Sequence, residues 1–312
     1  MKLCTFEVKT HLGRQRRLGA VVDGEIVDVN FAFANFIGDH RLADVLAPAT
    51  MRDYLDHGAT RMIADALRKC TASEGANGET IRYRCDQMKL LAPLPDPASV
   101  RDFYAFEDHV KKGFEKRGEP MPAEWYEMPV YYRSGHQNIV GTGEDVKWPS
   151  FTEKFDYELE LAAVIGKRGG NVKAEDARDH IAGFMVMNDF SARDIQRREM
   201  KARLGPAKGK DWCTAMGPYL VTTDEIGDPY NLEMTARVNG EVWSRGNSGS
   251  MYWKFEQMIE FLTLDDVIRP GDVIGSGTVG TGCGLELDRW VKRGDVIELE
   301  IERIGVLRNR VV

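Results

Sequence analysis

The sequence lacks any long hydrophobic segment. No stretch reaches the roughly 18 consecutive apolar residues that a membrane-spanning helix requires. The opening residues, MKLCTFEVKTHLG, become polar too soon for a secretory signal. We therefore expect no membrane partner and a cytoplasmic location.

Cysteines are few, and none forms a C-x-x-C pair. Their odd number and their spacing indicate neither a disulfide framework nor a thiolate zinc site. Cys213 and Cys283 lie in the glycine-rich half of the chain, where a packing role is the simplest interpretation for a buried thiol. The five are Cys4, Cys70, Cys85, Cys213 and Cys283.

Positive charge is in deficit, with a formal net charge of -7. Nucleic-acid binding needs a concentrated basic face, so the overall balance argues against a nucleic-acid partner. One basic patch, Arg14 to Arg17, reads as a solvated loop. A second, from Arg197 to Lys210, could attract an anionic substrate.

The first 90 residues predict a small β-rich domain with one helix. Strand signals fill residues 2–30, with Asp23-Gly24 as a two-residue hairpin turn. Apolar residues at helical spacing follow between Met51 and Lys69. Prolines at 93, 95 and 97 then mark a boundary near residue 90.

Strand signals dominate the rest of the chain, which we predict to be a catalytic, metal-binding domain over residues 91–312. Strands are expected over 156–165, 183–187 and 295–304, and over 232–243 around an Asn239-Gly240 turn. Helical patterns cover 100–116 and 254–262. The predicted fold class is therefore α+β.

Two glutamates in FDYELELAAVIG carry the first chemical signal. Glu158 and Glu160 are two residues apart on a predicted strand, so both carboxylates point to the same side. A solvated strand face is the ordinary interpretation of such a pair. The apolar continuation AAVI instead predicts a strand buried on both faces, and buried carboxylates need a cation.

Asp189 follows the apolar run GFMVMN and precedes SARDIQ, which places it at a strand end from which catalytic side chains commonly project. The alternative is a helix N-cap. If Asp189 joins the two glutamates, the all-carboxylate set selects a hard ion, Mg²⁺ first, with Mn²⁺ or Ca²⁺ as alternatives.

His109 is the histidine that stands beside an acidic, aromatic cluster, RDFYAFEDH. Asp102 lies seven residues before it, which is two turns on one face if the helix is continuous. A lone histidine is more often a surface or packed residue than a base. The residues alone leave both interpretations open.

Taken in order, these segments resemble the fumarylacetoacetate hydrolase family. The resemblance covers roughly residues 90–290 and depends on several spacings. It is carried by Asp102-Phe103-Tyr104 with His109, Glu158-Leu159-Glu160, MNDFSARDIQ, LGP, Gly209-Lys210, Thr214, and SGT followed by LEL.

The resemblance implies a mixed β-roll catalytic domain, a homodimer, a role in aromatic catabolism and a site of defined residues. The implied metal ligands are Asp102, Glu158, Glu160 and Asp189, with Thr214 close by. The implied catalytic residues are His109 as general base, Glu286 as the carboxylate that orients it, and Lys210. The implied substrate-binding residues are Tyr104, Arg193, Gln196 and Thr278.

The reaction expected from this resemblance is Mg²⁺-dependent hydrolysis of a carbon-carbon bond in a diketo acid, giving a carboxylic acid and a small keto acid. Family decarboxylases carry a glutamate three residues after the histidine, where this chain has Lys112. A tyrosine that several hydrolases place after SARDIQ is missing from RREMK, which leaves the substrate open. Alternatives are a keto-acid decarboxylase, an enol-diacid isomerase or hydratase, or a binding module with a vestigial site.

Overall fold

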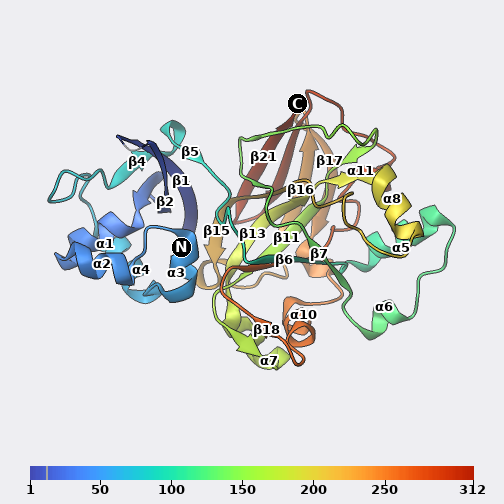
Figure 1. The fold of residues 1–312 in the computed structure, drawn as a ribbon, viewed down its shortest axis with the longest axis horizontal. Helices are drawn as coiled ribbons and strands as arrows, with labels where there is room; N and C mark the ends of the chain where they lie inside the picture. Colours follow the sequence, from blue (N-terminus) through green and yellow to red (C-terminus); the bar gives the residue numbers. More distant parts are fainter. Residues whose placement is uncertain (12) are drawn as a thin grey trace.

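The N-terminal part of the chain is an antiparallel ribbon packed against four helices (Figure 1). The structure, a computed structural model, describes residues 1–11 and 13–312. The ribbon contains β1 Lys2–Thr10, β2 Gly13–Val22 and β3 Glu25–Asp28, extended by β4 Arg82–Arg84 and β5 Lys89–Leu90. The helices are α1 Val29–Ile37, α2 His40–Leu46, α3 Met51–His57 and α4 Thr60–Lys69.

The predicted turn at Asp23-Gly24 is confirmed, but the predicted single helix from Met51 to Lys69 is wrong. Asp23 and Gly24 both have positive φ, 52° and 81°, as a type I′ hairpin requires. The helix is interrupted at Gly58, which adopts an extended conformation after α3. A Cβ at Gly58 would lie 2.5 Å from the Tyr54 ring, so the chain turns there where only glycine fits.

The central sheet joins the N-terminal ribbon to the rest of the protein. β1 pairs with β15, and the sheet runs in the order β4-β3-β2-β1-β15-β13-β11-β19-β6-β7, with β5 beside β1 and β8 beside β15. Because the sheet crosses residue 90 without a break, the proposed division into domains 1–90 and 91–312 stays a prediction. The added strands are β6 Ser99–Phe103, β7 Tyr131–Ser134, β8 Ile139–Val140, β11 Leu159–Ile165, β13 Ile181–Asp189, β15 Thr214–Thr222 and β19 Asp272–Gly275.

A second sheet, in the order β17-β16-β20-β21-β9, packs against the part of the first sheet formed by β11, β13 and β15. β11 is buried on both faces: Leu159 and Leu161 join the core shared with this second sheet, whereas Ala162 and Val164 join the core shared with the N-terminal helices. This confirms the predicted double burial. The strands are β9 Asp145–Val146, β16 Glu233–Val238, β17 Glu241–Asn247, β20 Val296–Ile301 and β21 Gly305–Val311.

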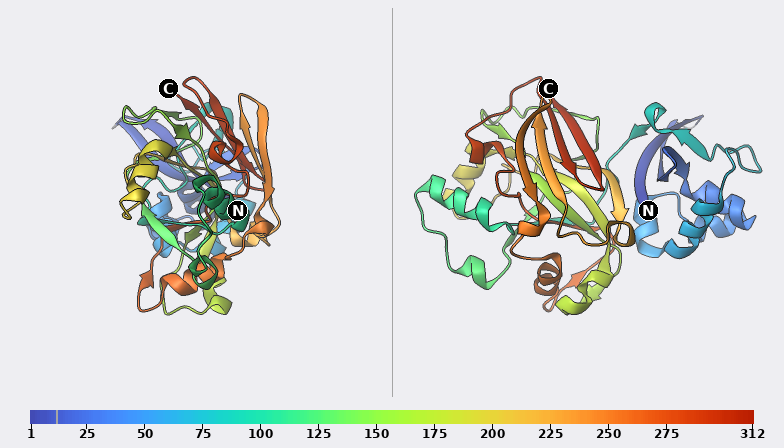
Figure 2. Two further views of the ribbon diagram at one scale, coloured as in Figure 1. Left: turned by 90° about the vertical axis from the view of Figure 1, so that its right-hand side faces the viewer. Right: turned by 180° about the vertical axis from the view of Figure 1, so that it is seen from behind.

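Shorter elements surround the two sheets. α5 and α6 lie at the end of the molecule opposite the N-terminal helices (Figures 1 and 2). The helices are α5 Glu107–Arg117, α6 Glu124–Glu127, α7 Ala174–Ala177, α8 Arg193–Lys201, α9 Thr223–Ile226, α10 Phe255–Leu262 and α11 Gly284–Leu287. Two small ribbons pair β10 Phe155–Asp156 with β14 Ser191–Ala192, and β12 Gly169–Gly170 with β18 Val267–Ile268.

The predicted helix over residues 100–116 is wrong in its first part. Residues 99–103 form β6, which pairs in parallel with β19, and α5 starts only at Glu107. Pairing within the sheet has overridden the helical pattern. Asp102 and His109 therefore lie on a strand and a helix, not on one helical face.

The structure confirms the α+β fold class, with mixed sheets and helices in one chain. In the part of the chain that the structure describes, no helix combines the length and the apolar character needed to cross a bilayer.

Candidate active site

Three buried carboxylates from three strands of the central sheet converge on one place. Asp102 comes from β6, Glu160 from β11 and Asp189 from the last position of β13. One oxygen of each lies within 4.8 Å of the others. All three side chains are at most 3% exposed. The fold thus brings together three of the four residues predicted to bind metal.

The glycine-rich segment at the end of β19 makes room for this cluster. Gly275 is the register partner of Asp102, and a Cβ at Gly275 would lie only 2.3 Å from Asp102 Oδ1. Gly277, at φ 76°, donates its N–H to the same oxygen at 3.2 Å. The Thr278 hydroxyl donates to Glu160 Oε1 at 3.4 Å. The sequence GSGT therefore shapes the floor of the cluster.

Several oxygens in the cluster lack a hydrogen-bond partner among the described residues. These are Glu160 Oε2, Asp189 Oδ1 and the hydroxyl of Thr214, which is the register partner of Asp189. Burial, followed by the neighbouring negative charges, raises the pKa of Asp102 and of Glu160 well above their ordinary values. Buried, unpartnered oxygens under mutual repulsion are the environment that a hard divalent cation neutralises, so the residues fit such an ion.

Glu158 lies in a different environment from Glu160. Arg193 Nη2 is 2.7 Å from Glu158 Oε1, and Lys210 Nζ donates to Oε2. Burial alone would raise the pKa of Glu158, but Arg193, Lys210 and His109 lower it below its ordinary value. Because both oxygens are already paired with cations, a ligand role for Glu158 stays a prediction.

Lys210 connects the two environments. Its ammonium group is buried, and it donates to Asp189 Oδ2 as well as to Glu158. The Tyr132 hydroxyl donates to that same Asp189 oxygen at 2.6 Å. Asp189 caps no helix, since Ala192 occupies the N-cap of α8 and no side chain bonds there.

Asp156 was not picked out from the sequence. It is fully buried, and its oxygens accept from Arg193 Nε at 2.8 Å and from the backbone N–H groups of Gly284 and Leu285 at 2.8 and 3.0 Å. It therefore ties the start of α8 to α11. The alternation that indicated Glu158 and Glu160 also includes Asp156, two residues earlier, and could have revealed it.

His109 and Glu286 meet although they are far apart in the sequence. His109 lies in the first turn of α5 and Glu286 on α11, and His109 Nδ1 is 3.1 Å from Glu286 Oε2. Glu286 also accepts the N–H of Thr281 at 3.2 Å and the thiol of Cys283 at 3.4 Å. Burial raises the pKa of Glu286, yet the adjacent His109 lowers it below its ordinary value overall. The pair lies beside the carboxylates, because Cys283 forms a backbone bridge with Glu158.

The predicted substrate-binding residues surround this arrangement. Tyr104 contacts the His109 ring edge-on, with centroids 5.2 Å apart, and burial raises its pKa to about 12. Gln196 accepts from Arg193 Nη1 at 3.1 Å, and Thr278 is bonded to Glu160. Their contact with a substrate stays a prediction.

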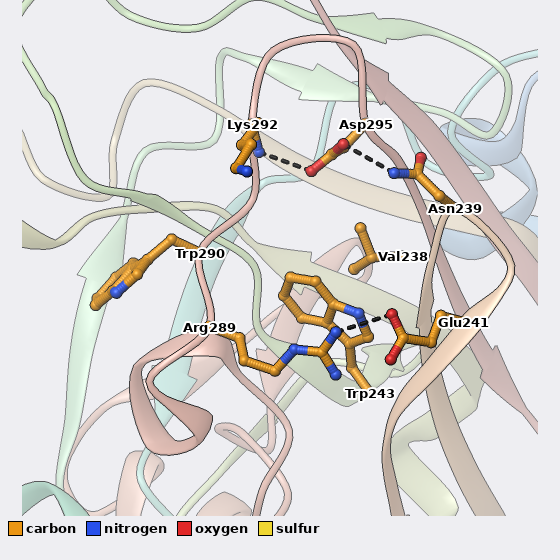
Figure 3. Close-up of a pocket in the computed structure, with 8 residues that line it drawn as sticks. All are labelled: Val238, Asn239, Glu241, Trp243, Arg289, Trp290, Lys292 and Asp295. Carbon is orange, nitrogen blue, oxygen red and sulfur yellow. Dashed lines mark hydrogen bonds and ion pairs between the residues drawn. The ribbon is translucent and has the colours of Figure 1, made fainter.

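A surface pocket of about 500 Å³ lies outside the predicted site, between the β16–β17 hairpin and the segment that follows α11 (Figure 3). Arg289 stacks over the Trp243 ring at 4.1 Å and pairs with Glu241 at 2.8 Å. None of the predicted site residues lines it. Its lining residues are Val238, Asn239, Glu241, Trp243, Arg289, Trp290, Lys292 and Asp295.

Residues 98–312 match the family model described as Fumarylacetoacetate (FAA) hydrolase C-terminal. The chain belongs to the fumarylacetoacetate hydrolase family. This confirms the resemblance seen in the motifs and their order.

Curated relatives in this family cover the whole chain. The human mitochondrial oxaloacetate tautomerase FAHD2A is 36% identical over 320 residues, covering 100% of this chain and 92% of the relative. The oxaloacetate tautomerase YisK of Bacillus subtilis strain 168 is 34% identical over 319 residues and covers both chains fully.

Solved structures of the family share the fold. The fumarylacetoacetate hydrolase of Exiguobacterium antarcticum superposes with a TM-score of 0.74 at 26% identity, covering 100% of this chain and 99% of that one. The 2-hydroxyhepta-2,4-diene-1,7-dioate isomerase of Mycobacterium marinum has a TM-score of 0.68 at 24% identity, with coverage of 100% and 98%. The chain is thus similar to proteins named as tautomerases and to one named as a hydrolase, so membership in the family indicates an enzyme without fixing its reaction.

Proposed function

We propose that this protein is a divalent-metal-dependent enzyme that interconverts the keto and enol forms of a short 2-keto dicarboxylic acid of the oxaloacetate type. The observation that carries the proposal is the buried carboxylate cluster beside a histidine–glutamate pair. The choice of tautomerisation is supported by the full-length relatives at 34–36% identity, whose names state that reaction.

Asp102, Glu160 and Asp189 would hold the ion, and Glu158 would complete the set once Lys210 releases it. The oxygen-only donor set favours Mg²⁺, with Mn²⁺ or Ca²⁺ as alternatives. When bound, the ion would act as a Lewis acid that polarises the keto oxygen and makes the adjacent C–H more acidic.

His109 is the base in this proposal. With Nδ1 facing Glu286, the other ring nitrogen can exchange a proton with the carbon next to the keto group. Glu286 stabilises the imidazolium that forms, and its lowered pKa keeps it ionised for that purpose. Tautomerisation requires only that one proton leaves carbon and one reaches oxygen, so no water needs to attack.

Arg193 and Lys210 supply positive charge for the two carboxylates of such a substrate. Both are buried and already bonded to carboxylates of the protein, so a substrate carboxylate could exchange with those partners. Tyr104, Gln196 and Thr278 would contact the substrate around them. We further propose a cytoplasmic homodimer, following the expectations from the sequence.

A second candidate is hydrolytic cleavage of a carbon-carbon bond in a diketo acid such as an acylpyruvate or fumarylacetoacetate. The specific observation in its favour is the pairing of His109 with Glu286, because an oriented histidine can also take a proton from an attacking water. Decarboxylation is less well supported. Lys112 stands where the family decarboxylases carry a glutamate, and it pairs with Glu115 on the exposed side of α5.

The experiment is a substrate panel with Mg²⁺. We would follow the enol absorbance of oxaloacetate, the diketone absorbance of acylpyruvates and fumarylacetoacetate, and the release of pyruvate or another keto acid. Loss of the enol signal above the uncatalysed rate, without a cleavage product, supports the tautomerase. Cleavage products from a diketo acid support the hydrolase.

The control for this panel is a pair of variants. His109→Gln should lose the activity, whereas the same change at exposed His136 should retain it. Equal activity in both variants, or none toward any acid in the wild type, would contradict the proposed function.

A further inference from the structure

Three side-chain atoms of different chemistry converge next to the carboxylate cluster but outside it. They are a ring nitrogen of His109, Cys283 Sγ and a carboxylate oxygen of Glu286, all within 4.8 Å of one another. Nδ1 is 3.1 Å and Sγ 3.4 Å from Glu286 Oε2. Each side chain is buried, with Cys283 fully inaccessible.

His109 Nδ1 is not satisfied in this arrangement. It lies within ion-pair distance of Glu286 Oε2, but no geometric hydrogen bond to Nδ1 is formed by the described residues. The residue is only 6% exposed, so solvent does not supply a partner freely. A buried polar atom of this kind costs free energy unless a further group binds it.

We propose that His109, Cys283 and Glu286 form a second cation site that takes Zn²⁺ in preference to Mg²⁺. One nitrogen, one sulfur and one oxygen are a donor set typical of Zn²⁺, whereas Mg²⁺ prefers oxygen alone. With Zn–S near 2.3 Å and Zn–N near 2.0–2.1 Å, ligand atoms of a tetrahedral site lie roughly 3–4 Å apart. The distances from Glu286 Oε2 to His109 Nδ1 and to Cys283 Sγ fall in this range. The sequence contains no C-x-x-C pair, and here one cysteine is joined by ligands from distant elements.

Zn²⁺ at this site would inhibit the enzyme. The thiol of Cys283 would lose its proton to solvent as its sulfur bonds to the ion, with no change in oxidation state. The ion would occupy His109 Nδ1 and Glu286 together, so the histidine ring would be fixed and its pairing with the carboxylate lost. This consequence rests on the proposed role of His109, whereas the binding itself does not.

The binding is tested with Co²⁺, which takes zinc sites and reports a thiolate ligand by a charge-transfer band in the near ultraviolet. The full-length protein is first saturated with Mg²⁺ to fill the carboxylate cluster and is then titrated with Co²⁺. We expect the band to grow to one equivalent in the wild type, to vanish in Cys283→Ser and to persist in Cys213→Ser, a buried cysteine elsewhere in the core.

A wild type without the band, or a Cys283→Ser variant that keeps it, would overturn the site. Because Cys283→Ser could fail to fold, circular dichroism checks it, and His109→Gln provides a second variant that leaves the thiol in place. In His109→Gln, Co²⁺ should bind at least about 10-fold more weakly. Unchanged affinity in that variant would also overturn the proposal.

The inhibition is tested separately. At saturating Mg²⁺, Zn²⁺ should lower the turnover of the wild type, and Cys283→Ser should need at least about 10-fold more Zn²⁺ for the same fractional loss. Equal sensitivity in the two proteins would overturn the inhibitory role. If no substrate is turned over, the proposed function fails while the Co²⁺ titration still decides the site.

Discussion

Glu158 and Glu160 are two residues apart and both buried, yet the charges around them are opposite. Glu158 lies between two cations, Arg193 and Lys210, which lower its pKa against the effect of burial. Glu160 lies against Asp102 and Asp189, and burial together with these charges raises its pKa. One glutamate is neutralised by the protein itself, and the other requires a further positive charge.

The contrast between the charges around Glu158 and Glu160 shows that burial of a carboxylate does not by itself define a metal site. The informative feature is a buried carboxylate oxygen without a partner, as at Glu160 Oε2. We assign the metal to the Glu160 group, Asp102, Glu160 and Asp189, which Glu158 joins only when Lys210 releases it. The Glu158 side, which is Glu158 with Arg193 and the nearby His109–Glu286 pair, is assigned to the substrate and the proton.

The largest effect should come from the base on the Glu158 side. We expect His109→Gln to lower kcat by about 1000-fold, within the range of general acid–base catalysis. Metal binding at the Glu160 group should be unchanged in this variant. Steady-state kinetics measure kcat, and a Mg²⁺ titration measures the metal affinity. A loss of metal affinity in parallel with kcat would contradict the separation of the Glu158 side from the metal site.

The next effect should come from Asp156, which holds Arg193 beside Glu158. Asp156→Asn removes the charge from a buried pair but keeps a hydrogen-bond acceptor, so the free energy of unfolding should fall by roughly 3 kcal/mol, the low end for a broken buried pair. KM should also rise, because Arg193 is less firmly placed. Urea unfolding measures the stability loss.

The matched control for Asp156 is Glu241→Gln, which breaks the exposed pair with Arg289 and should change stability little. If both variants unfold at the same urea concentration as the wild type, Asp156 does not organise the Glu158 side.

A smaller effect is expected from Lys210, the cation shared by Glu158 and Asp189. Lys210→Met removes a charge that competes with the metal for the Asp189 oxygen, so Mg²⁺ affinity should increase by about 10-fold while turnover falls. Calorimetry and kinetics on the same sample test this. A weaker Mg²⁺ affinity would show that Lys210 supports the metal.

The smallest effect is the pH dependence of stability in the metal-free protein. Glu160 has a raised pKa, so its contribution to stability falls as pH rises from the ordinary value of 4.5 toward the raised value. Glu158 has a lowered pKa, so its contribution is present above 4.5 and is lost as pH falls toward the lowered value.

Glutamine substitutions separate the contributions of Glu160 and Glu158 to the pH dependence of stability. At pH 8, Glu160→Gln should raise the melting temperature of the metal-free protein and Glu158→Gln should lower it. Shifts of the same sign in both variants would contradict the comparison.

Local signals in the sequence predicted the elements that depend on local chemistry. Asn239-Gly240 has positive φ at both residues and joins β16 to β17, as expected. The double burial of β11 followed from its apolar run. In contrast, the pattern from Val100 onward predicted a helix, whereas these residues form a strand that pairs with β19. A single sequence does not show which distant segment will pair with them, so this error could not be avoided from local signals.

The candidate site was predictable in its residues but not in its contacts. Strand alternation placed Glu158 and Glu160 on one side, and the structure places both near the same site. However, β11 begins only at Leu159, and the residue at 158 is bridged to Cys283. Alternation cannot reveal that Arg193 and Lys210 reach one glutamate and not the other, since both arrive through the tertiary fold.

The most direct test is a calorimetric titration of Mn²⁺ or Mg²⁺ into the wild type and into Glu160→Gln at neutral pH. We predict one tight equivalent in the wild type and an affinity at least about 100-fold lower in the variant. Equal affinity in the two proteins, or no binding by the wild type, would contradict the assignment of the metal to Asp102, Glu160 and Asp189.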